Sequence, residues 1–259
     1  MSTGKDGKEA MRPVLSAVYH GTRESVGTAL AGAESAGALL AVVQAALQQV
    51  EESVNGVRRE SGVVTACAVG CSFCCWLNID VLAHEVLLLA AYVKAHRTPW
   101  EVEELAAAAV GRRDERAGLD HGQRQRVRKP CLLLDDAVCS VYPVRPGACR
   151  RYWSGDLEAC HAMWEDPEVT ASVEFPLLQE TGRAAAAGVH HALVRAGYDG
   201  CYYDLPSALA EALTDPGCLE RWCGGEKVFS EGAETRTPEG FRQAEALERL
   251  RRELGTGME

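Results

Sequence analysis

The chain has 259 residues, of which 47% are hydrophobic, so it is long enough for one large domain or two small ones with a packed core. Its formal net charge of −10 argues against a broad nucleic-acid-binding face, which needs a basic patch. No apolar run approaches the roughly 20 residues that span a bilayer, and the polar N-terminus lacks the apolar core of a secretory signal, so we expect no membrane partner.

The first predicted elements follow a loose N-terminal tail over residues 1–25, which is rich in Gly, Lys, Ser and Thr. Apolar residues at helical spacing predict one helix over residues 35–54 and a second over 82–93. A third helix is predicted over 98–113, because Thr98-Pro99-Trp100-Glu101 is typical of a helix start with a capping threonine and an early proline.

A basic segment then precedes a hairpin. Residues 112–129 hold six arginines and Lys129 with few apolar side chains, which favours a solvated loop; the alternative is an anion-binding strip beside a metal site. Residues 132–141 have the composition of a short β-hairpin. Its turn lies between Cys131 and Cys139, so both cysteines would lie near one end of it.

Further helices are predicted over residues 177–196, 207–213 and within the C-terminal segment 231–259. The predicted fold class is therefore mainly α. We expect a single helical domain over residues 26–230, which contains a cysteine-cluster region at 63–165 and one short β-hairpin, followed by a C-terminal helix.

Eight of the eleven cysteines fall into two groups in the middle of the chain. They are Cys67, Cys71, Cys74 and Cys75, spaced C-x3-C-x2-C-C, and then Cys131, Cys139, Cys149 and Cys160. We expect a cytoplasmic location that keeps these thiols reduced, which favours metal or redox chemistry over disulfides. Thiolates are the strongest common protein ligands for zinc and for iron–sulfur clusters, so the eight cysteines are candidate metal ligands.

The spacing leaves the number and kind of metal centres open. Eight thiols allow two four-sulfur sites, or one site plus spare thiols. Adjacent side chains diverge, so Cys75 either serves a second nearby centre or packs as a small apolar residue. The scattered ligands after Cys131 slightly favour iron over zinc, and the alternative to any metal is a set of buried free thiols. His161, beside Cys160, is a candidate replacement ligand, although a surface histidine is the simpler interpretation.

The second group includes the motif Tyr142-x2-Arg145-Pro146-x2-Cys149-Arg150. Four thiolates around one zinc ion carry a net negative charge, and cysteine-bound iron–sulfur clusters are usually anionic as well. Arg145 and Arg150 are therefore candidate cofactor-binding residues that offset this charge and donate hydrogen bonds to sulfur. Pro146-Gly147 predicts a turn that directs Cys149 inward.

These motifs resemble the YkgJ-type cysteine-cluster family, whose CxxCxxCC domain is described as zinc- or iron-chelating. The resemblance rests on Cys71-Ser-Phe-Cys74-Cys75, on the later cysteines and on the Arg-Pro motif, and it covers roughly residues 63–165. The family's first cysteine sits one residue closer to the second than Cys67 does here. The resemblance implies metal chelation, and one branch is similar to flagellin lysine N-methylases, which implies that catalysis is possible on this scaffold.

Two main hypotheses follow, with a metal carrier as a third. The first is a metal-binding protein that holds an iron–sulfur cluster or Zn²⁺ through cysteine thiolates. The second is a metal-dependent enzyme that uses S-adenosylmethionine for methyl transfer, or that performs redox chemistry. The sequence contains no dinucleotide-binding fingerprint, phosphate loop or serine nucleophile elbow, so it assigns no catalytic residue.

Overall fold

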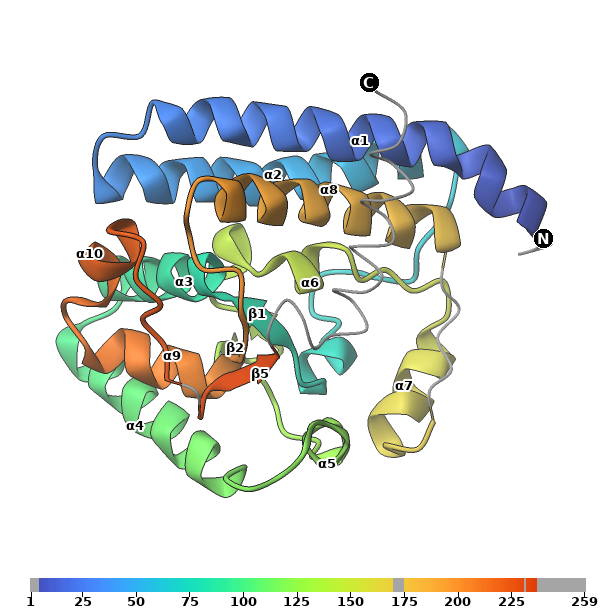
Figure 1. Cartoon of the computed structure of the whole chain (residues 1–259). Helices are drawn as coiled ribbons and strands as arrows, with labels where there is room; N and C mark the ends of the chain where they lie inside the picture. Colours follow the sequence, from blue (N-terminus) through green and yellow to red (C-terminus); the bar gives the residue numbers. More distant parts are fainter. Residues whose placement is uncertain (1–4, 170–174, 231, 237–259) are drawn as a thin grey trace.

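Three long helices form one layer of the molecule (Figure 1). The computed structural model describes residues 5–169, 175–230 and 232–236. Helices α1 (Lys5–Ala31), α2 (Ala36–Ser61) and α8 (Pro176–Arg195) pack side by side. Helix α2 begins where the Ser35 hydroxyl accepts a hydrogen bond from the Ala38 amide at 3.1 Å. It ends at Gly62, whose φ of 66° is readily adopted by glycine.

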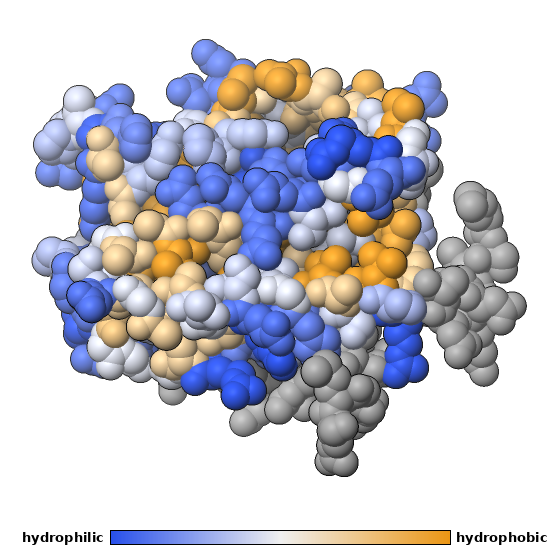
Figure 2. Space-filling model, turned by 90° about the horizontal axis from the view of Figure 1, so that it is seen from above, coloured by the Kyte–Doolittle hydropathy of each residue, from blue (hydrophilic) through white to orange (hydrophobic). Residues whose placement is uncertain are grey.

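Helix α1 contradicts the prediction of a loose tail over residues 1–25. The segment is polar in composition, but Leu15, Tyr19, Val26 and Leu30 recur at helical spacing and are buried. The outward surface is different: seen from above, hydrophilic residues form a broad band across the molecule, with hydrophobic residues in separate patches (Figure 2). The N-terminal segment is therefore an amphipathic helix, and its few apolar positions determine its structure.

The second layer contains helices α3 (Ala83–His96), α4 (Pro99–Glu115), α9 (Leu205–Thr214) and α10 (Cys218–Cys223). Helix α4 begins as predicted. The Thr98 hydroxyl accepts a hydrogen bond from the Glu101 amide at 3.3 Å, and the Glu101 carboxylate accepts one from the Thr98 amide at 2.8 Å. Helix α3 is buried along most of its length, since it packs against α2 of the first layer and against α9 of its own layer.

A three-stranded antiparallel sheet lies between these helices and was not predicted. Its strands are β1 (Asp80–Leu82), β4 (Tyr202–Asp204) and β5 (Glu234–Arg236), in the order β1-β4-β5. Val81 pairs with Tyr203 and both are fully buried. Each strand has only three residues and its partners lie far away in the chain, so local alternation gives no signal for it.

The predicted hairpin is confirmed. Strands β2 (Leu134–Asp135) and β3 (Val138–Cys139) pair in antiparallel fashion. Asp136 and Ala137 connect them with φ angles of 44° and 63°, as a two-residue hairpin turn with left-handed backbone requires. The remaining short helical elements are α5 (His121–Arg126), α6 (Gly147–Arg150), α7 (Leu157–Glu165), and the 3₁₀ turns η1 (Phe73–Trp76) and η2 (Tyr142–Val144).

The fold is mainly α, as predicted. The remaining predicted helices lie close to their expected places: residues 35–54 overlap α2, 82–93 overlap α3, 177–196 overlap α8 and 207–213 fall within α9. The predicted C-terminal helix lies outside the described residues, apart from the part of segment 231–259 that forms β5. Among the described helices, none has the length and apolar character needed to cross a membrane.

Candidate metal centre

The two cysteine groups meet at the backbone. The amide of Cys131 donates a hydrogen bond to the carbonyl oxygen of Cys75 at 2.8 Å. The chain turns directly after Cys131, where the Leu134 amide bonds to the Cys131 carbonyl oxygen at 3.1 Å, and it returns through β3 with Cys139. Two segments far apart in the sequence are thus joined at the point where each carries a thiol.

Four thiols are mutual neighbours. They come from η1, from the approach to β2, from β3 and from α6. They are Cys75, Cys131, Cys139 and Cys149. Within every pair of this set, the thiols are near enough for the negative charge of one to raise the pKa of the other. We call these residues the thiol tetrad.

The other four cysteines of the two groups lie beside the tetrad. Cys67 is close enough to Cys71 and Cys160 for their charges to raise its pKa, and its sulfur accepts a hydrogen bond from the Ser154 amide at 3.4 Å. Cys74 interacts with Cys71 on one side and with Cys75 and Cys149 on the other. All eight sequence-predicted ligands therefore gather in one region, with Cys74 between the tetrad and the remaining three.

Burial and mutual repulsion keep most of these thiols protonated. Burial raises the pKa of Cys131 to about 11, and it also raises the pKa of Cys67, Cys139 and Cys149. Cys149 keeps contact with solvent although many protein atoms surround its thiol. Cys75 is the exception, because a hydrogen bond from the Cys74 thiol lowers the pKa of Cys75 to about 7 and raises that of Cys74.

The donor set fits a thiophilic metal. All the cysteines are free thiols, and soft thiolates select zinc or iron over hard cations. A cation placed among them would reverse the effect of the neighbouring charges and favour the thiolate forms. Within residues 5–169, 175–230 and 232–236, however, no three His, Cys, Asp or Glu side chains are arranged to hold a metal ion. Reorientation of the side chains is therefore needed for ligation.

Arg145 and Arg150 do not donate to sulfur in the described contacts, contrary to the prediction. Glu51 of α2 binds both, with Arg145 Nη2 and Arg150 Nη1 each 2.5 Å from one of its carboxylate oxygens. Arg150 also donates to the carbonyl oxygens of Arg145 and Pro143, at 2.8 and 2.6 Å. A carboxylate is a better acceptor for a guanidinium than a thiol. Both arginines therefore fix the loop before Cys149, and their charges still lower the pKa of Cys139.

Glu85 anchors α6, and sequence reasoning did not assign it this role. Its carboxylate accepts hydrogen bonds from the Gly147 amide at 2.7 Å and from the Leu82 amide at 2.8 Å. A Cβ at Gly147 would lie 3.2 Å from Glu85 Oε1, so glycine permits this close approach. The helix that carries Cys149 is thereby fixed to the start of α3. The sequence feature that could have indicated this role is an acidic residue early in an otherwise apolar helix.

An aromatic cluster holds α7 against η1. It consists of Phe73, Trp76, His161 and Trp164, whose neighbouring rings lie 5.3 to 5.8 Å apart between centroids. The His161 ring contacts Phe73 and Trp164, and its Nδ1 lies 3.4 Å from the Glu165 carboxylate. The predicted candidate ligand His161 thus lies in a packing contact that keeps Cys160 near the first cysteine group.

The three later cysteines lie apart from this region. Cys218 is buried in the core that includes Trp222, and Cys201 and Cys223 pack against the same core. Their pKa values are raised mainly by burial, and none of the eight central cysteines contributes to these shifts.

No curated protein and no solved structure matches this chain. A family model does match residues 66–168, the segment that contains all eight gathered cysteines. The match confirms the family resemblance inferred from the sequence motifs. The matching model is that of the CxxCxxCC family, described as a putative zinc- or iron-chelating domain, to which residues 66–168 are similar.

Proposed function

We propose that this protein binds zinc or an iron–sulfur cluster through the thiol tetrad, with Cys67, Cys71, Cys74 and Cys160 as the further ligands of the same region. The observation that carries the proposal is the mutual proximity of Cys75, Cys131, Cys139 and Cys149, which come from four separate elements. Core packing alone gives no reason for four thiols to meet, whereas four sulfurs complete the shell of zinc or of a cluster.

Cys75 has a specific place in this proposal. Of the two alternatives for the adjacent pair, its grouping with Cys131, Cys139 and Cys149 supports a ligand role distinct from that of Cys74. Its pKa is lowered to about 7 while those of the other tetrad thiols are raised, so we expect it to be the first of the tetrad to bind the metal. A reduced, cytoplasmic setting is part of the proposal, because an oxidising compartment would pair such thiols.

The metal would cross-link a segment that the core does not hold. No residue from 61 to 80 is fully buried, and Val64 and Val69 are 85% and 97% exposed. The segment carries three further proposed ligands before Cys75, namely Cys67, Cys71 and Cys74. Bound metal therefore contributes folding free energy to the cysteine region, as it does in small zinc domains.

The test is metal analysis of anaerobically purified variants. We expect Cys131→Ala and Cys149→Ala to lose most of the bound metal and to melt at a lower temperature than the parent protein. Cys223→Ala is the matched control, because this thiol is half-buried and lies apart from the tetrad. Full metal content in both tetrad variants would contradict the proposal.

The absorption spectrum of the same samples separates the metals. Broad visible absorption indicates an iron–sulfur cluster, whereas a colourless, zinc-replete protein indicates a closed four-sulfur shell. The second result would also count against the redox form of the enzyme hypothesis, since zinc has no redox chemistry.

A further inference from the structure

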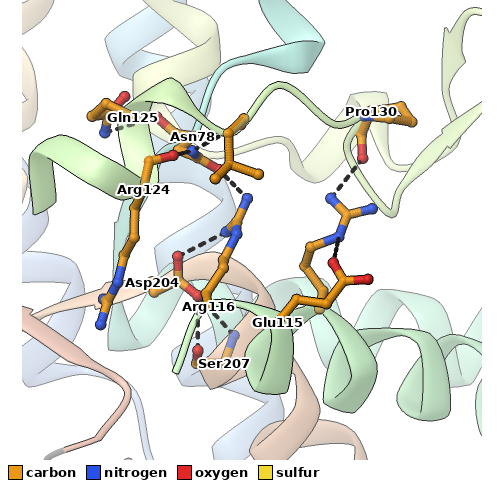
Figure 3. Close-up of polar contacts among 10 residues, drawn as sticks. Asn78, Glu115, Arg116, Arg124, Gln125, Pro130, Asp204 and Ser207 are labelled. Carbon is orange, nitrogen blue, oxygen red and sulfur yellow. Dashed lines mark hydrogen bonds and ion pairs between the residues drawn. The ribbon is translucent and has the colours of Figure 1, made fainter. Parts of the chain in front are cut away.

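Two arginines at the end of α4 contact the two cysteine segments: Arg112 in the last turn of the helix, and Arg116 directly after it. Figure 3 shows Arg116 between Asn78 and Asp204. Arg112 and Arg116 are four residues apart, so they lie on one face of the helix. Arg116 is 4% exposed and its Nη1 lies 2.9 Å from Asp204 Oδ1, while its Nη2 donates to the side-chain oxygen of Asn78. Arg112 donates to the carbonyl oxygen of Pro130 at 3.2 Å.

The two acceptors lie close to tetrad cysteines in the chain. Asn78 is three residues after Cys75, and Pro130 directly precedes Cys131. The Asn78 side-chain amide also donates to the carbonyl oxygens of Arg124 and Val127, the second at 3.3 Å. Asn78 is therefore bound both to α4 and to the segment that leads to Cys131.

The anchor of this network is Asp204. Asp204 ends β4, and its other carboxylate oxygen accepts a hydrogen bond from the Ser207 hydroxyl at 2.7 Å. The Arg116 and Asp204 side chains are only 5% and 4% exposed, so separating this pair would leave an uncompensated buried charge. Asp204 holds Arg116 to the sheet, and the contact between Arg116 and Asn78 therefore opposes movement of Asn78.

We propose that Arg112 and Arg116 are positioning residues for the metal centre, because they set the separation of the two segments that carry Cys75 and Cys131. The inference rests on the proposed function. It also assigns a role to the basic segment 112–129. Several of its cations are bound to protein groups: Arg116 to Asp204, Arg126 to Glu168 and Lys129 to Glu115. Only the Arg116–Asp204 pair is buried; the other two are exposed to solvent, and all three cations are bound to carboxylates of the protein.

The test compares metal release from three variants. Asn78→Ala removes the contact to Arg116 but leaves the buried Arg116–Asp204 pair intact, and Arg112→Met removes the contact to Pro130. Thr98→Ala is the matched control, because it weakens the start of the same helix without touching either cysteine segment. The readout is the rate at which the metal bound on purification passes to an excess of a chromophoric chelator.

We expect Asn78→Ala and Arg112→Met to release metal about 10-fold faster or more, the size of effect typical when a group that orients a metal ligand is removed. Thr98→Ala should release the metal at the parent rate, even if its melting temperature falls as much as those of Asn78→Ala and Arg112→Met. Arg112→Lys, which keeps a donor near Pro130, should restore part of the loss.

Parent-like release from both Asn78→Ala and Arg112→Met would overturn the positioning role and leave the proposed function intact. Equally fast release from Thr98→Ala would overturn it too, because the effect would then be general helix destabilisation. A parent protein that carries no metal would overturn the proposed function itself.

Discussion

His84 is a neutral imidazole enclosed by the protein interior. It is 1% exposed, and its Nδ1 has no hydrogen-bond partner among the described residues. Burial, and to a smaller degree the charge of His190, lowers the pKa of His84 to about 3. A group of this kind makes stability depend on pH, since only the unfolded chain can take up the proton at moderately acid pH.

The sign of this dependence follows from the two pKa values. The ordinary value is 6.5 and the folded value is about 3, so stability is full above 6.5 and is lost as the pH falls from there toward 3. Each pH unit in this range removes about 1.4 kcal/mol from the free energy of unfolding. Urea denaturation between neutral pH and about pH 4 measures the loss, which should be smaller in His84→Leu.

Acid would also release bound metal from both the parent protein and His84→Leu. The comparison is therefore between the slopes of unfolding free energy against pH in the two proteins. Parallel loss of stability in His84→Leu and the parent would show that His84 does not control the acid sensitivity.

At the scale of single elements, α1 and α8 approach each other closely at one glycine. A Cβ on Gly188 of α8 would lie 2.7 Å from the Tyr19 carbonyl oxygen and 2.9 Å from the Thr22 Cβ. The close contact explains why a small residue stands here. It also shows that α1 is part of the packed structure, although its composition had predicted a tail.

Gly188→Ala should therefore lower the free energy of unfolding by about 1–3 kcal/mol, because the backbone of α1 must move to make room. Gly21→Ala should instead raise the free energy of unfolding, because Gly21 lies on the exposed side of α1 and a Cβ there would meet no atom within 4 Å. There we expect a gain of up to about 1 kcal/mol from better helix propensity. Denaturant titration of both variants tests the pair, and destabilisation by both would contradict it.

The elements differ in how well local sequence predicts them. Helices α2, α3, α4, α8 and α9 and the β2–β3 hairpin follow from periodicity, caps and turn residues, all of which act within a few residues. Strand β1 pairs with β4 across more than a hundred residues, and no local pattern encodes that partner. Helix α1 differs from the predicted tail because a few buried apolar residues at helical spacing determine its structure, although its composition is polar.

The same distinction applies to the candidate metal site. The sequence spacing identifies which cysteines are candidate ligands, and the structure brings all of them together. The grouping of Cys75 with Cys131, Cys139 and Cys149 depends on long-range contacts, so it was not predictable. The role of Glu51 was also missed, because a carboxylate on α2 gives no sign in the sequence that it will bind Arg145 and Arg150.

At the scale of the whole molecule, stability is distributed unevenly. The helices α1, α2 and α8 contribute buried residues to the main apolar core, and α1 and α8 share a second, smaller cluster. Residues 61–80, in contrast, contain no fully buried residue. Removing the metal should therefore loosen one region and leave the other nearly unchanged. Amide hydrogen exchange measures this, since protection falls first where few apolar contacts hold the backbone.

We expect chelation to raise exchange strongly in residues 63–80 and 127–150, and only slightly in α2 and α8. The Cys131 amide is the most informative position, because its hydrogen bond to Cys75 joins the two cysteine segments. Loss of protection spread evenly over all the helices would mean that the metal stabilises the entire fold and does not act locally. No change at Cys131 would mean that this hydrogen bond persists without metal, so that α4 and the hairpin alone hold the two segments together.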